Sequence, residues 1–185
     1  MSVLLCSEIL IAIYRFLPLL QNRLYMAKLY INKDIVADKD KMENWYLTGE
    51  EGLSFPDIQN FLSWIDPNDH VIDIEIHSCG GDAVEGYAIY DALRASGKQI
   101  SCTAVGRCAS MATVILLAAA KERRFAYPHA KFLIHKPYMA SYDGDLDLET
   151  LESIKSNLES EKNKMLALYV ERTGSEASVI EAQMN

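Results

Sequence analysis

Three short segments of the sequence carry residues that could perform acyl-transfer chemistry. Gly80 and Gly81 follow an alternating apolar run, and backbone N–H groups at such a turn can stabilise negative charge on a carbonyl oxygen. Ser110 precedes a second apolar run, and His135 lies near the end of a third. A serine hydroxyl is a weak nucleophile at neutral pH and needs a nearby base, which an imidazole supplies. The three segments together predict the parts of a serine hydrolase.

Each feature also has a structural explanation. A Gly-Gly pair is common in tight turns, a serine is a favoured N-cap, and a histidine in an apolar strand is often a satisfied core residue. For Ser110, position 113 is neither Glu nor Gln, so a capping box is not completed. Cys79 and Cys108 are rival nucleophiles, but free cysteines commonly serve as small apolar fillers, and we rank them below Ser110.

The hydrophobic periodicity predicts strands that alternate with helices. Predicted strands cover residues 28–36, 70–78, 99–106 and 131–137, and predicted helices cover 54–65, 83–96, an apolar stretch that starts at Ser110, and 147–173. The polar residues 37–45 are expected to form a loop. This alternation predicts an α/β fold with largely parallel pairing. The glycines, Ser110 and His135 then fall at the carboxyl ends of strands, where reacting groups collect.

Composition restricts the class of protein. The 185 residues suit one domain, and a net charge of −8 argues against nucleic acid as a partner. Four cysteines without a C-x-x-C pair signal no zinc site and no disulfide framework, which favours reduced thiols in the cytoplasm.

Residues 1–25 are apolar, but Glu8 and Arg15 interrupt them and no cleavage site follows, so we expect neither export nor a membrane role. Met26 resembles the natural start of the folded domain, residues 26–185. Three interpretations of residues 1–25 stay open: an extension of uncertain role, an amphipathic docking helix, and an artefact of start-codon choice.

Three ordered motifs resemble the caseinolytic Clp serine peptidase family, the proteolytic subunit of the Clp machine. They are "IEIHSCGGDAVEGYAIYDALR", "GRCASMATVILLAAA" and "KFLIHKP". The sequences of these motifs are most similar to those of phage and prophage relatives that act in capsid maturation. The resemblance implies a crotonase-like spiral of ββα units, with residues 147–173 as a projecting handle helix where rings of subunits meet.

The resemblance also implies roles for residues. Ser110 matches the nucleophile and His135 the general base, while the N–H groups of Gly81 and Met111 match the oxyanion hole. Expected partners are further copies of the chain in a ring, polypeptide substrates, and either an ATP-driven AAA+ unfoldase or phage capsid proteins. Neither a metal nor a nucleotide cofactor is implied for the subunit itself.

One catalytic group of the family has no match. The family's aspartate follows the Thr-Gly pair, here Thr173-Gly174, and alignment places it shortly past Asn185, so we expect a domain truncated at its C-terminus. Losing this acid costs on the order of 10⁴ in kcat in trypsin. Three functions stay open: a serine endopeptidase, a weak or inactive ring or scaffold homologue, and a crotonase-like acyl-CoA enzyme.

Overall fold

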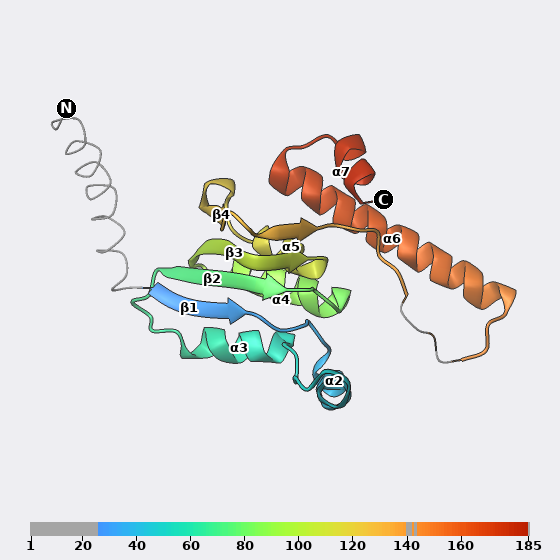
Figure 1. Ribbon diagram of the computed structural model, residues 1–185, viewed down its shortest axis with the longest axis horizontal. Helices are drawn as coiled ribbons and strands as arrows, with labels where there is room; N and C mark the ends of the chain where they lie inside the picture. The colour runs from blue at the N-terminus through green and yellow to red at the C-terminus, as the bar shows by residue number, and fades with distance from the viewer. Residues whose placement is uncertain (1–25, 140–141, 143, 185) are drawn as a thin grey trace.

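The computed structural model describes residues 26–139, 142 and 144–184, and the predictions for residues 1–25 lie outside this range. Its centre is a five-stranded sheet in which every pair of strands is parallel. The order is β1-β2-β3-β4, and β5 pairs with the later part of β3 (Figure 1). The strands are β1 (Met26–Ile31), β2 (Val71–Ser78), β3 (Gln99–Ala109), β4 (Arg124–Ala126) and β5 (Lys131–Leu133). The predicted parallel α/β architecture is confirmed.

The core forms around β2 because its sequence alternates. Ile72, Ile74 and Ile76 are completely buried, and the residues between them are less so. Burying a side chain of this size contributes roughly 1.5–3 kcal/mol to folding. In the parallel register Ile74 lies between Leu29 of β1 and Cys102 of β3, so the three strands share one apolar layer.

Helices connect the strands as parallel pairing requires. They are α3 (Phe55–Trp64) between β1 and β2, α4 (Ala83–Ala95) between β2 and β3, and α5 (Met111–Leu116) after β3. The predicted apolar face of α4 is buried except at Val84, which is 76% exposed. The helix predicted from Ser110 is short, because β3 continues through Ala109 and α5 has only 6 residues.

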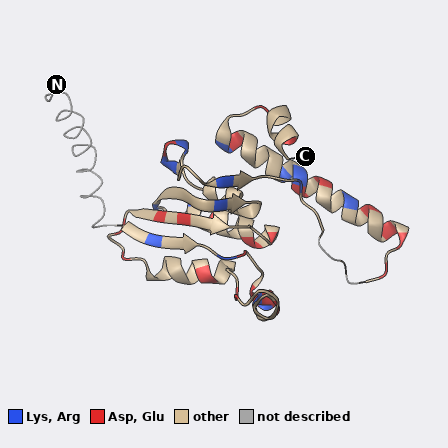
Figure 2. Cartoon of the chain, viewed as in Figure 1, with Lys and Arg blue, Asp and Glu red and all other residues tan. Residues whose placement is uncertain are grey.

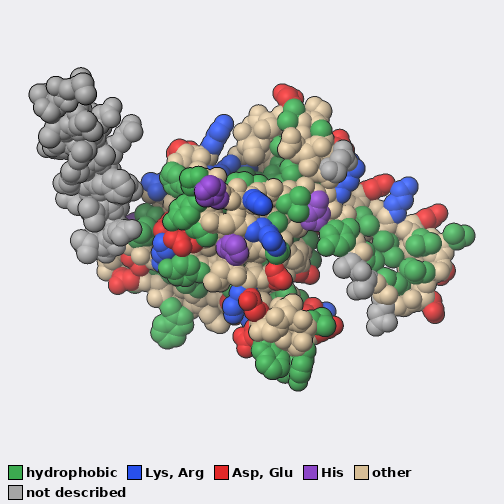
Figure 3. Space-filling model, in the orientation of Figure 1, with side chains coloured by type: hydrophobic (Ala, Val, Ile, Leu, Met, Phe, Trp, Pro, Cys, Tyr) green, Lys and Arg blue, Asp and Glu red, His purple; other side chains and the backbone are tan. Residues whose placement is uncertain are grey.

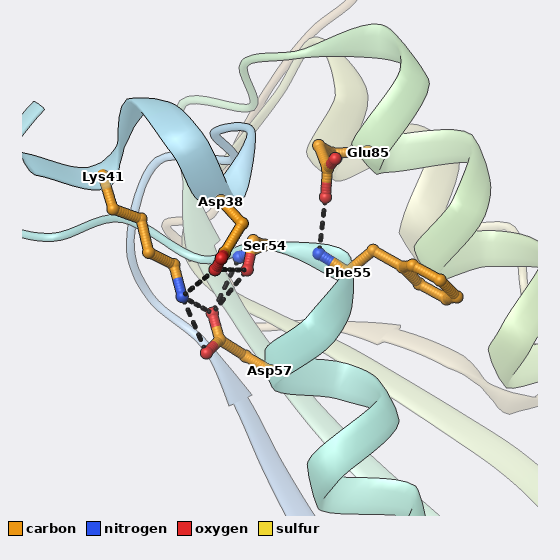
Figure 4. A network of polar contacts seen from close by, with 6 residues as sticks. All are labelled: Asp38, Lys41, Ser54, Phe55, Asp57 and Glu85. Carbon is orange, nitrogen blue, oxygen red and sulfur yellow. Dashed lines mark hydrogen bonds and ion pairs between the residues drawn. The ribbon is translucent and has the colours of Figure 1, made fainter.

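The prediction of a loop at residues 37–45 is wrong. This segment forms the 3-10 turn η2 (Asp38–Asp40) and the start of helix α2 (Lys41–Thr48). Two ion pairs stabilise this turn: the Lys41 ammonium pairs with the carboxylates of Asp38 and Asp57 (Figure 4). Asp57 also completes a capping box with Ser54 at the start of α3. No residue of α2 is buried, so hydrophobic periodicity could not have revealed the helix.

The handle predicted for residues 147–173 is confirmed as helix α6 (Leu148–Thr173), with Asp147 as its N-cap. Its first half buries no residue and extends beyond the sheet, whereas Met165 and Tyr169 anchor the second half (Figure 1). Charges of both signs follow one another along α6 (Figure 2). A helix not anticipated from the sequence, α7 (Ala177–Gln183), folds back beside α6. Among the described residues, no helix is long and apolar enough to cross a membrane.

Candidate active site

Three neighbouring strands deliver the predicted site residues to one edge of the sheet. Ser110 directly follows β3, His135 lies two residues beyond β5, and Gly81 lies three residues beyond β2. Because β2 and β5 both run parallel to β3, their carboxyl ends meet at the same edge. These three residues line one open cavity of about 580 Å³. The structure therefore brings together groups that are distant in the sequence.

Ser110 occupies an unusual turn between β3 and α5. Its φ is +52°, and it is the only non-glycine residue in the described part of the chain with a positive φ. Its N–H donates to the carbonyl oxygen of Leu133 (2.8 Å), and its own carbonyl oxygen accepts from the Thr113 hydroxyl (2.6 Å). Ser110 holds the N-cap position, but its hydroxyl makes no capping hydrogen bond. A strained residue with an uncommitted hydroxyl is typical of functional sites.

The glycine turn packs directly against Ser110. Gly80 has φ +87°, and a Cβ there would lie 2.5 Å from the Ala109 oxygen and 2.8 Å from the Ser110 Cβ. Hydrogen bonds from Ile35 N to Gly80 O and from Asp82 N to Ile35 O, both 2.8 Å, hold the turn. Only glycine can bring the two backbones this close.

Met111 begins α5 beside this turn. A Cβ on Gly80 would lie 2.7 Å from the Met111 nitrogen, so this amide also lies against the glycine turn. As the first residue of a helix, Met111 has no intrahelical acceptor for its N–H. The side chain of Met111 is buried and anchors the helix start. The assignment of Gly81 and Met111 to an oxyanion hole stays a prediction.

His135 lies beyond its strand and partly exposed, not inside an apolar strand. The three residues of β5 are all exposed, because β5 pairs with β3 as a short edge strand. The His135 Nδ1 atom lies 2.7 Å from the main-chain oxygen of Lys136, and the Tyr138 ring lies 5.4 Å from the imidazole. A core role for His135 is therefore wrong, and the residue lines the same cavity as Ser110.

The rival nucleophiles are in different environments. Cys108 is completely buried, and burial raises the pKa of its thiol to about 12, which keeps it protonated. Cys79 is exposed and lines the Ser110 cavity. Its sulfur accepts a hydrogen bond from the Arg107 guanidinium (2.9 Å), and Arg107 lines a second cavity. The other nearby imidazole, His77, lines this second cavity, and its Nδ1 accepts a hydrogen bond from the main-chain N–H of Arg107 (3.2 Å).

Sequence reasoning missed a link between the Ser110 turn and the handle. The Thr113 hydroxyl, which donates to the Ser110 carbonyl, also contacts the Tyr169 hydroxyl of α6. Burial raises the pKa of Tyr169 to about 12, although the hydrogen bond with Thr113 lowers it. In the sequence, the only signal was a threonine within an otherwise apolar stretch, and it did not identify Tyr169 as the partner.

The residues matched by a known family include all four predicted site residues. The family described as Clp protease matches residues 57–185, more than half of the chain. The chain belongs to the Clp protease family. Residues that precede the matched part also contribute to the cavity, since Asp40 and Asn44, at the start of α2, line it.

Individual relatives agree with this assignment. The chain is 33% identical over 125 residues to ATP-dependent Clp protease proteolytic subunit 1 of Chlamydia muridarum, covering 65% of this chain and 62% of the relative. It is 37% identical over 102 residues to the ATP-dependent Clp protease proteolytic subunit of Porphyromonas gingivalis, covering 53% of this chain and 46% of that relative. The match thus spans less than two thirds of these relatives' lengths.

A solved structure supports the fold. A mutant of ClpP1 from Listeria monocytogenes superposes with a TM-score of 0.66 at 20% sequence identity, covering 92% of this chain and 83% of that one. At this identity the likeness concerns the fold alone, and it confirms the Clp-protease fold predicted from the three motifs.

Proposed function

We propose that the protein is a serine endopeptidase in which Ser110 is the nucleophile and His135 the general base. The observation that carries the proposal is the Ser110 turn, at φ +52°, whose hydroxyl is free of capping and shares a cavity with His135. In the first step His135 Nε2 accepts the hydroxyl proton while Ser110 Oγ attacks the substrate carbonyl. His135 then returns the proton to the leaving amine, and an acyl-enzyme remains for hydrolysis.

The oxyanion that forms in each step is held by the N–H groups of Gly81 and Met111. Both amides belong to backbone that packs around Gly80, so neither has to reorganise during the reaction. The close packing of the Gly80-Gly81 turn against the start of α5 supports this assignment.

The substrate is polypeptide, delivered to an assembly of several copies of the chain. Relatives named proteolytic subunits of an ATP-dependent protease suggest a ring of subunits and an ATPase partner that unfolds substrates. The exposed first half of α6 is suited to contacts between copies. The role in phage capsid maturation stays a prediction, because these relatives are named as bacterial Clp subunits. The described cysteines are free thiols, which fits a reducing cytoplasm.

A fluorophosphonate probe tests the nucleophile. We expect covalent labelling of the wild-type protein at Ser110, no labelling of Ser110→Ala, and unchanged labelling of Ser63→Ala, whose side chain is exposed on α3. Peptide hydrolysis should disappear together with the label. An adduct at another residue would overturn the assignment, and an assembled protein without label or turnover would favour a scaffold.

A further inference from the structure

Four positively charged side chains line a cavity that is separate from the one beside Ser110. This cationic cavity has a volume of about 400 Å³, and its charged lining residues are Arg94, Lys121, Arg124, Arg172 and the acidic Glu171. None of the described residues lines both this cavity and the Ser110 cavity. A local excess of positive charge stands out in a chain whose net charge is −8.

The ends of helices bring these four cations together. Arg94 lies in the last turn of α4, and Arg172 lies in the last turn of α6. Lys121 begins the 3-10 turn η3 (Lys121–Arg123), which follows α5, and Arg124 comes directly after this turn. The C-terminal end of a helix carries about half a unit of negative charge, which nearby cations stabilise. Capping of helix ends therefore explains part of the cluster.

Two of the cations, Arg124 and Arg172, are held side by side by shared main-chain acceptors. Arg124 Nε and Arg172 Nη2 both donate to the main-chain oxygen of Ala119, at 2.9 and 3.0 Å. Arg172 Nε also donates to the main-chain oxygen of Leu117 (3.0 Å), and Arg124 Nη1 donates to the main-chain oxygen of Arg172 (2.7 Å). The two guanidinium groups are therefore neighbours in fixed positions.

Capping leaves the charge of these two arginines without a counterion. Arg124 makes three hydrogen bonds to main-chain oxygens and Arg172 makes two, whereas each guanidinium has five N–H groups. Within the described residues, none of the four cations forms an ion pair with a carboxylate. Burial and the nearby charge of Arg172 both lower the pKa of Arg124. Its guanidinium still stays protonated at neutral pH, so an anion would stabilise the pair.

We propose that the cationic cavity binds a small ligand with two or more linked phosphate groups, held by the guanidiniums of Arg124 and Arg172 and by the side chains of Arg94 and Lys121. The planar guanidinium group matches phosphate oxygens with paired hydrogen bonds. Four cations around one cavity suit a compact ligand with several negative charges, whereas a single carboxylate carries one. This binding site does not depend on the peptidase function proposed above.

Titration calorimetry of the full chain with tripolyphosphate tests the site. We expect saturable binding that weakens as potassium chloride is added, because salt screens the attraction between charges. Arg94→Gln and Lys121→Gln should each weaken binding about 10-fold, since each removes a hydrogen bond to a charged group. Neither side chain has a printed role in capping or ion pairing, so both variants should fold. Lys155→Gln removes the same charge from a side chain of α6 that is 77% exposed, and it should leave binding unchanged.

Thermal unfolding provides a second measurement of the same site. A ligand that binds only the folded protein raises its Tm, by about 5–10 °C at a concentration 100 times the Kd for a chain of this length. We expect this rise with tripolyphosphate for the wild-type protein and a smaller one for the Arg94→Gln, Lys121→Gln double variant. Absence of saturable binding, or equal weakening by Lys155→Gln, would overturn the site. Tetraglutamate that binds as tightly as tripolyphosphate would overturn the choice of phosphate over an acidic peptide.

Discussion

The Ser110 turn concentrates backbone strain at one residue, and its neighbours explain how that strain is tolerated. A non-glycine residue with positive φ costs of order 1–3 kcal/mol and persists only where surrounding contacts determine its conformation. Here the Ser110 N–H and carbonyl are both hydrogen-bonded, to Leu133 and Thr113. The backbone of Ser110 is thus fixed on both sides, while its side chain makes no capping hydrogen bond and the residue lines the cavity.

Gly80 supports this turn by the absence of a side chain. Gly80→Ala combines an unfavourable φ of +87° with close contacts to Ala109 and Ser110, so we expect a loss of about 3 kcal/mol or more in the free energy of unfolding. Gly97→Ala is the matched control, because its φ is +69° but nothing lies within 4 Å of the added Cβ. It should cost only about 1 kcal/mol. Urea unfolding measures both, and equal losses would contradict the packing argument.

At the scale of elements, α5 and α6 are joined through buried hydroxyls. Burial raises the pKa of Tyr169 to about 12, and the hydrogen bond with Thr113 opposes that rise. An unfolded tyrosine titrates near 10, so the native state favours the neutral phenol. The corresponding stability is complete below about pH 10 and is lost as the pH rises from about 10 towards 12.

Tyr169→Phe should therefore flatten the alkaline limb of the stability profile. We expect the free energy of unfolding of the wild-type protein to fall between about pH 10 and 12, with a contribution from Tyr169 of roughly 2–3 kcal/mol at most. The phenylalanine variant lacks this contribution, whereas Tyr46→Phe, at a side chain 74% exposed, should retain the wild-type slope. Urea midpoints across this pH range provide the measurement, and identical slopes in all three proteins would show that Tyr169 does not titrate differently on unfolding.

The elements predicted correctly from the sequence are those that bury one face. Strand β2 alternates strictly, α3 begins with a capping serine, and the buried residues of α4 recur at helical spacing. Helix α2 buries nothing, so periodicity did not reveal it. The strand predicted for residues 131–137 is present only as β5, whose three residues are all exposed. Residue types at strand ends were enough to predict Ser110 and His135 as a pair.

The parts of the site that were not predicted depend on tertiary packing. Thr113 lies three residues after Ser110, but its partner Tyr169 is 56 residues further along the chain. The main-chain N–H of Lys136 donates a hydrogen bond to the main-chain oxygen of Met184, and no side-chain pattern in the sequence predicts such a bond. Such contacts depend on how α6 and α7 pack against the rest of the protein. Local secondary-structure propensity does not determine that packing.

For the molecule as a whole, apolar surface remains where no part of the described chain covers it. Hydrophobic side chains appear at α2 and around the free end of α6 (Figure 3). On α6, Leu148 is 81% exposed and Leu151 is 47% exposed, and the first half of the helix buries no residue. A projecting helical segment gains little stability without tertiary contacts. In the proposed assembly, a second copy of the chain packs against this apolar surface.

The final prediction concerns this assembly. Replacing Leu151 with Asp places a charge in the apolar part of the exposed surface, so we expect a smaller particle in sedimentation velocity experiments and an unchanged far-ultraviolet circular dichroism spectrum. Ser153→Asp introduces the same charge at an exposed position two residues away on α6 and should leave the particle size unchanged. Because the Leu148–Thr173 helix reaches the Ser110 turn through Tyr169 and Thr113, loss of assembly should also slow labelling of Ser110. A wild-type protein that sediments as a monomer, or two aspartate variants of equal size, would contradict a role for the handle in assembly.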